Sequence, residues 1–96
     1  MSIRASVAVT TTYVVERAVP VLEVTHELDP EDGSSVWQFH CGNGDYDPGV
    51  LRLVSIQQIL DLDASVEAAL ALPAGSEARR ASPSAPWVIS PLQHAR

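Results

Sequence analysis

The strongest constraint on this fold is a pair of extended segments separated by nine residues that favour turns. Residues 21–26 are rich in β-branched side chains, and residues 36–41 alternate strictly along the chain. Because successive side chains of a strand point to opposite faces, Trp37 and Phe39 share one face. Residues 27–35 contain an Asp-Pro and an Asp-Gly pair, both typical of turns. The sequence therefore predicts an antiparallel β-hairpin, whose register the long connection leaves open.

Three further segments have extended character. Residues 7–15 are dominated by valine and threonine, which favour a strand. Residues 50–54 follow a loop with three glycines and a proline and return to strand character, and residues 76–80 are predicted as a short edge strand.

Two short helices follow residue 55. Ser55 and Gln58 match a capping box, which predicts a helix that ends near Leu62. Residues 63–65 offer a second N-cap, and apolar spacing continues until Pro73 and Gly75 stop the helix.

These elements predict an α+β fold: a small antiparallel sheet of three to five strands with two short helices packed on one face. A chain of 96 residues has room for one domain. Pro83, Pro86 and Pro91 oppose regular structure over residues 81–96. We therefore expect a single domain over residues 1–87 and a flexible tail over residues 88–96.

Charge and composition restrict the partners. Six arginines and no lysine face twelve acidic residues, a net charge of −6. Nucleic acids and anionic membranes are bound by clustered basic side chains, so neither is an expected partner. The first eight residues lack the apolar core of a signal peptide, no apolar run is long enough to span a membrane, and the one cysteine excludes an internal disulfide. We expect a cytoplasmic protein.

The most reactive pair in the sequence is His40-Cys41, since nucleophilic catalysis needs a thiolate beside an imidazole. Neighbours on a strand diverge, so Cys41 would need His26 or His94 instead. The favoured interpretation makes Cys41 a small buried hydrophobic residue and places His40 on the solvent face.

Metal motifs also fail. His26-Glu27 begins like a zinc-protease helix, but Pro30 stands where the second histidine belongs. Residues 43–47 imitate a calcium loop, but Pro48 replaces the required glycine and Val54 the bidentate glutamate, which leaves only a weak oxygen site at Asp45 and Asp47. We predict no catalytic residues, no metal and no cofactor, and therefore no enzyme.

Two ordered blocks carry a resemblance. The first runs from Pro20 to Gly42 and ends in Trp-Gln-Phe-His-Cys-Gly; the second runs from Asp63 through Leu-Pro-Ala-Gly to Pro86-Trp87. Over residues 19–87 the chain resembles a family of small uncharacterised bacterial proteins, and is more distantly similar to an immunity-protein-like domain whose members neutralise toxins by binding them. Members usually have Asp-Pro-Ser where this chain has Asp63-Ala64-Ser65. The resemblance implies a small α+β fold and a protein-binding role.

Three function hypotheses follow. The first is a non-catalytic protein-binding module, whose acidic loops would attract a partner with a basic surface. The candidate partner-binding residues are Asp29, Glu31, Asp32, Asp45, Tyr46, Asp47 and Trp87. The alternative is a small-ligand-binding protein or small enzyme that uses the region of His26, His40, Cys41 and Asp45–Asp47. The third is a homodimer, because the strand predicted over residues 7–15 is a liability as a bare edge.

Overall fold

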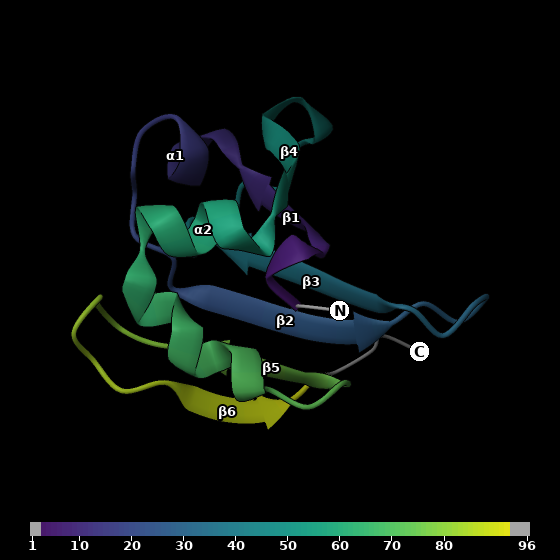
Figure 1. The fold of residues 1–96 in the computed structure, drawn as a ribbon. Helices are drawn as coiled ribbons and strands as arrows, with labels where there is room; N and C mark the ends of the chain where they lie inside the picture. The colour runs from purple at the N-terminus through teal and green to yellow at the C-terminus, as the bar shows by residue number, and fades with distance from the viewer. Residues whose placement is uncertain (1–2, 93–96) are drawn as a thin grey trace.

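The computed structural model describes residues 3–92, which form one mixed sheet in the order β4-β1-β3-β2-β5-β6 (Figure 1). The strands are β1 (Val7–Thr11), β2 (Glu23–Leu28), β3 (Ser35–His40), β4 (Leu51–Ser55), β5 (Ser76–Arg79) and β6 (Val88–Pro91). The helices are α1 (Thr12–Val15), α2 (Ile56–Leu62) and the 3₁₀ helices η1 (Ile3–Ala5), η2 (Pro48–Val50) and η3 (Ala64–Ala71).

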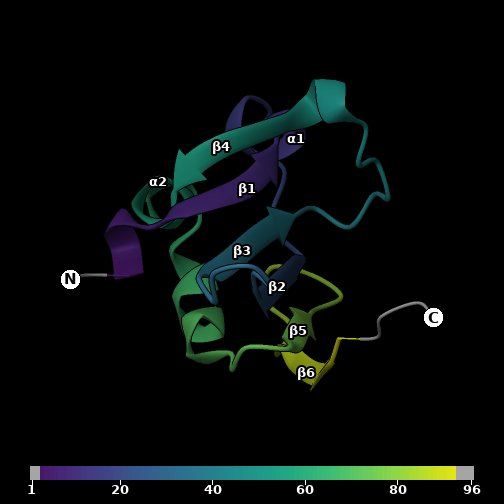
Figure 2. The same cartoon turned by 90° about the vertical axis from the view of Figure 1, so that its right-hand side faces the viewer.

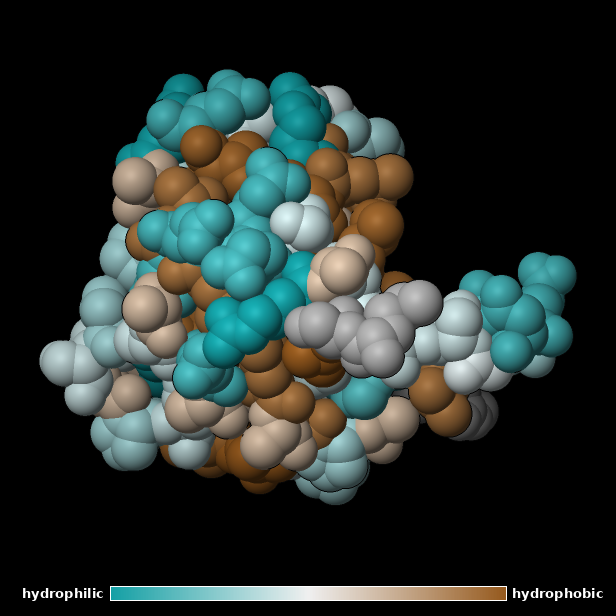
Figure 3. Space-filling view, in the orientation of Figure 1, coloured by the Kyte–Doolittle hydropathy of each residue, from teal (hydrophilic) through white to brown (hydrophobic). Residues whose placement is uncertain are grey.

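The predicted hairpin is confirmed as β2 and β3. The two strands pair antiparallel, with Val24 opposite Phe39 and His26 opposite Trp37. Gly33 takes a φ of +72° in the turn, a left-handed conformation that costs glycine little. The tip of the β2–β3 hairpin projects from the body of the molecule and is hydrophilic (Figure 3).

The sheet differs from the predicted one in size and in direction. It has six strands among the described residues, not three to five, and it is mixed, not antiparallel. The sheet is mixed because β3 lies between β1 and β2. There it runs parallel to β1, with Ala8 beside Trp37, while every other neighbouring pair is antiparallel.

The strand predicted over residues 7–15 ends at Thr11, and residues 12–15 form α1 instead. The Val19 N–H donates to the Tyr13 carbonyl (2.9 Å), and Ala18 adopts a φ of +54°, as at helix C-caps. The turn buries Val14, so tertiary packing overrides the strand propensity of valine.

The strand that would be a liability as a bare edge is not an edge strand. β1 lies between β4 and β3, and the two edges of the sheet are β4 and β6. The edge argument for a homodimer therefore does not apply to β1.

The prediction that residues 81–96 lack regular structure was wrong for one segment. Residues 88–91, inside the expected tail, form β6 and pair with β5, Ile89 opposite Ala78. Pro91 is tolerated because β6 is an edge strand, which needs no N–H donor on its outer side. Residues 93–96 lie outside the described residues.

Both predicted helices pack on one face of the sheet (Figure 2). α2 begins with the predicted capping box, in which Gln58 N–H donates to Ser55 Oγ (3.1 Å) and Ser55 N–H to Gln58 Oε1 (3.0 Å). The second helix is the 3₁₀ helix η3. Its buried residues, Val66, Ala69 and the following Leu72, recur every three positions, which is the period of a 3₁₀ helix.

The core lies between these helices and the sheet. The expected core positions Trp37, Phe39 and Cys41 are all buried. The other buried apolar residues are Ala8, Val14, Val21, Val24, Ile56, Ile59, Leu60, Val66, Ala69, Leu72 and Ala78. Every helix within residues 3–92 is too short or too polar to cross a membrane.

Candidate functional site

The sheet face opposite α2 and η3 is here called the open face. Figure 2 shows these helices on one side of the sheet and the loop between β3 and β4 on the other. Strand register places one row of side chains across all six strands of this face, because residues directly opposite each other point the same way. From β4 to β6 the row consists of Leu53, Val9, Gln38, Thr25, Glu77 and Ser90.

The open face changes character across this row. Over β4 and β1 it is apolar, with Leu53 74 % and Val7 63 % exposed. Over β2 and β5 it carries the carboxylates of Glu23, Glu27 and Glu77, which occupy alternate strand positions. Interfaces between proteins combine apolar and polar areas in this manner.

A charged network lies on the acidic half. Glu23 accepts a hydrogen bond from the Tyr46 hydroxyl (2.8 Å) and pairs with Arg79 Nη1 (2.9 Å), and Arg79 Nε also pairs with Glu77. Burial and the hydrogen bond to Glu23 raise the pKa of Tyr46 to about 12. Within residues 3–92 the Glu27 carboxylate has no hydrogen-bond or ion-pair partner.

His40 lies beneath this network, only 4 % exposed, which corrects its expected place in solvent. The His40 side chain faces the open side of the sheet, but the Tyr46 ring packs edge-on against the imidazole, with 4.7 Å between the ring centroids. Burial lowers the pKa of His40, so the imidazole is neutral. Its Nε2 bonds to Gln38 Oε1 (2.8 Å), an acceptor, which leaves Nδ1 as a buried acceptor with no partner among the described residues.

A cavity of about 200 Å³ opens beside His40. Three carboxylates and one guanidinium border it, so its net charge is negative. Thr25 Oγ1 is a second buried polar atom there without a partner among the described residues. The lining residues are Glu23, Val24, Thr25, Glu27, Gln38, His40, Tyr46, Glu77, Ala78, Arg79 and Leu92.

The two acidic loops lie at opposite ends of the β2–β3 hairpin, because His40 is opposite Glu23 at one end and Ser35 is opposite Leu28 at the other. Of the predicted partner-binding residues, only Tyr46 lines the cavity.

Several loop carboxylates shape their own turns. Asp29 accepts from the Glu31 N–H, and Asp32 accepts from the Ser34 N–H. The Ser34 side chain, and then its N–H, lower the pKa of Asp32 by hydrogen bonding to the carboxylate. The hydrogen bond from Tyr13 likewise lowers the pKa of Asp45. Asp47 accepts from Gly49 N–H (2.8 Å).

The residues proposed for catalysis are not brought together. His26 lies on the helix-covered face, stacked on Trp37 at 4.0 Å, with Nδ1 2.8 Å from the Leu72 carbonyl. Cys41 is buried, and His94 lies outside the described residues. Within residues 3–92, no three His, Cys, Asp or Glu side chains gather to hold a metal ion.

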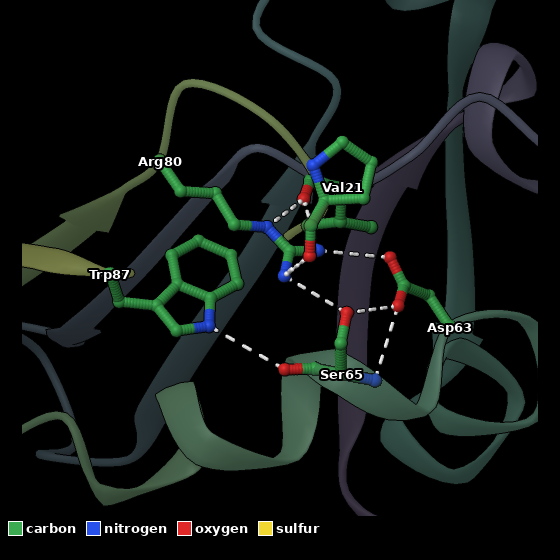
Figure 4. Close-up of polar contacts among 6 residues, drawn as sticks. Val21, Asp63, Ser65, Arg80 and Trp87 are labelled. Atoms are coloured by element: carbon green, nitrogen blue, oxygen red, sulfur yellow. Dashed lines mark hydrogen bonds and ion pairs between the residues drawn. The ribbon is translucent and has the colours of Figure 1, made fainter. Parts of the chain in front are cut away.

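Trp87 belongs to a second polar cluster, centred on Arg80 (Figure 4). The Arg80 side chain is 2 % exposed, and its guanidinium carbon lies 4.2 Å from the Trp87 ring centroid. Its five N–H groups all donate. The acceptors are Val21 O (from Nε at 3.0 Å and Nη2 at 2.9 Å), Ser65 Oγ and Pro83 O (each 2.9 Å from Nη1) and Asp63 Oδ2 (3.1 Å from Nη2).

Sequence analysis missed Glu23, Thr25, Glu77 and Arg79. Their signal is the alternation of polar side chains along residues 23–27 and 77–79, which marks one solvent-facing side of each strand. Alternation alone did not reveal that β2 and β5 are neighbours, which brings the two polar sides together.

No family model, no curated protein and no solved structure matches this chain.

Proposed function

We propose that this protein is a non-catalytic binding module whose open face binds a partner protein with a basic surface. The observation that carries the proposal is the cavity on that face, where Glu23, Glu27 and Glu77 border it and Arg79 is the one cation that residues 3–92 contribute. A cavity of net negative charge favours a cationic group from the partner.

The apolar half of the open face supports the same function. Leu53 and Val7 are largely exposed beside the acidic half, so a partner gains apolar burial as well as charge complementarity. A sheet face that α2 and η3 leave uncovered, divided in this way, suits a partner element that is apolar on one side and basic on the other.

The hairpin between β2 and β3 extends the acidic surface. Asp29, Glu31 and Asp32 follow directly after the strand that carries Glu27. With a net charge of −6, this arrangement attracts a basic partner over a distance and gives an association rate that falls as salt is added. The resemblance to an immunity-protein-like domain would make this partner a toxin.

Position-specific photocrosslinking in cells that make the protein tests the proposal. A photoreactive phenylalanine analogue replaces Glu27 on the open face or, as a matched control, Gln57 on the exposed side of α2. We expect a heterologous crosslink at position 27 and none at position 57, with the crosslinked peptide rich in arginine or lysine.

Three outcomes would contradict the proposal. One is equal crosslinking at both positions, and another is a crosslinked peptide without basic residues. The third is a product with twice the mass of the chain, since the open face would then contact a second copy, as in the predicted homodimer.

A further inference from the structure

Three polar groups beside the cavity on the open face can accept hydrogen bonds that no described residue donates, and one of them, the Thr25 hydroxyl, can also donate. His40 Nδ1 and Thr25 Oγ1 have no partner among the described residues, and neither does the Glu27 carboxylate. His40 is buried and lines the cavity. Buried polar atoms are normally satisfied, so each exception needs an explanation.

A ligand that donates hydrogen bonds and carries positive charge suits these groups best. An anion would meet three carboxylates, and an acceptor would find Arg79 as the one charged donor that residues 3–92 place on the cavity wall. A guanidinium has five N–H donors and no acceptor, whereas an ammonium has three donors around a compact, strongly hydrated charge. The guanidinium suits several acceptors spread along a cavity wall.

The protein already builds one such site for itself. Arg80 donates to a carboxylate, a hydroxyl and backbone carbonyls, with the Trp87 ring against its guanidinium. The cavity offers the same kinds of group in its carboxylates, the Thr25 hydroxyl and the Tyr46 ring, and none of the residues from 3 to 92 places a buried guanidinium there.

Arg79 does not fill this role. Its guanidinium lies at the surface, 62 % exposed, where it bridges Glu23 and Glu77. Arg79 does not pair with Glu27. Glu27 is the diagonal neighbour of Glu77 across the β2–β5 pair, because Thr25 is directly opposite Glu77. Diagonal neighbours of this kind lie about 7–8 Å apart, which leaves room for a planar cation between the two carboxylates.

We propose that the cavity bounded by Glu27, Glu77 and His40 receives the guanidinium of an arginine side chain that the partner protein presents. This inference rests on the proposed function for the source of the arginine, but the cavity can be tested without the partner.

The test is an NMR titration of the full chain with N-acetyl-arginine methylamide. The citrulline analogue, nearly the same in shape but neutral, and the lysine analogue serve as comparison probes. The variant Glu27→Gln/Glu77→Gln removes the two carboxylates. The control Glu31→Gln/Asp61→Asn makes the same change of net charge elsewhere.

We expect saturable shifts of the Thr25, Gln38 and Glu77 amides with the arginine probe, and at least about tenfold weaker binding in the Glu27/Glu77 variant. The control variant should change affinity less than about twofold. Equal binding of the citrulline or lysine probe overturns the guanidinium assignment. So do equal losses in both variants, or shifts confined to residues 29–34.

The two proposals fail separately. If position 27 crosslinks to a basic partner but the arginine probe does not bind, the binding function stands and the guanidinium site is wrong. If the probe binds in the cavity but position 27 gives no specific crosslink, the cavity holds a free guanidinium compound and the proposed partner is wrong.

Discussion

The Arg80 cluster and the open-face cavity both gather charged side chains from distant parts of the chain, yet they differ in how far their hydrogen bonds are satisfied. All five Arg80 donors have acceptors. In the cavity, His40 Nδ1 and Thr25 Oγ1 have none among the described residues. A satisfied buried network joins structural elements, whereas a buried polar atom without a partner needs an explanation, and for the cavity the one proposed is an external donor.

The largest effect is expected from Arg80→Met. The substitution removes the Arg80 donors from Asp63 Oδ2 and from the buried Val21 carbonyl, so the free energy of unfolding should fall by about 3–5 kcal/mol. Urea unfolding measures the loss. The control Arg52→Met removes only exposed contacts, a 3.8 Å ion pair with Glu16 and hydrogen bonds to the Gly49 and Leu51 carbonyls, so the loss should be below about 1 kcal/mol. Equal losses of unfolding free energy in the two variants would mean that the Arg80 cluster does not stabilise the fold more than an exposed ion pair does.

A smaller difference in stability loss is expected between substitutions of the two hairpin histidines, His26 and His40. His26→Ala removes the stack on Trp37 and the contact with the Leu72 carbonyl, at a cost of about 1–3 kcal/mol. His40→Phe removes an unsatisfied acceptor together with the Nε2 hydrogen bond to Gln38, two changes of opposite sign, and should change stability by less than about 1 kcal/mol while it weakens arginine-probe binding. Urea unfolding and the NMR titration measure both. The comparison fails if His40→Phe destabilises more than His26→Ala.

The pH dependence of stability isolates His40 further. Burial lowers its pKa below the ordinary 6.5, and Glu23 opposes this shift, while the Tyr46 ring contacts the imidazole. The unfolded chain therefore binds the proton first. The stabilisation is complete above about pH 6.5 and is lost as the pH falls from there through the folded pKa. Urea unfolding between about pH 7 and pH 5 should show a shallower slope for His40→Phe than for the unsubstituted protein; an equal slope would refute this.

The smallest effect is expected from Tyr46→Phe. It deletes a half-exposed hydrogen bond to Glu23, at a cost of about 0.5 kcal/mol. Since the pKa of Tyr46 is raised to about 12, an alkaline absorbance titration should lose its step near that pH. An intact step would show that another tyrosine accounts for it.

Part of the candidate site was accessible from the sequence. Tyr46 was proposed for partner binding, and strand alternation correctly put His40 on the face opposite Trp37. The burial of His40 was not predicted, because it depends on the loop that carries Tyr46 over the sheet. The carboxylates of Asp29, Asp32 and Asp47 in the acidic loops accept from nearby backbone N–H groups, and their role in partner binding stays a prediction.

Local chemistry decided the hairpin, the capping box of α2 and the buried positions of Trp37 and Phe39, because turn residues, caps and strand alternation act over a few residues. Only the tertiary structure decided the parallel pairing of β1 with β3, the helical turn at residues 12–15 and the place of β6. Each depends on which distant surfaces are buried together. The cavity has the same origin, since β2 and β5 must become neighbours before Glu27 and Glu77 can face one ligand.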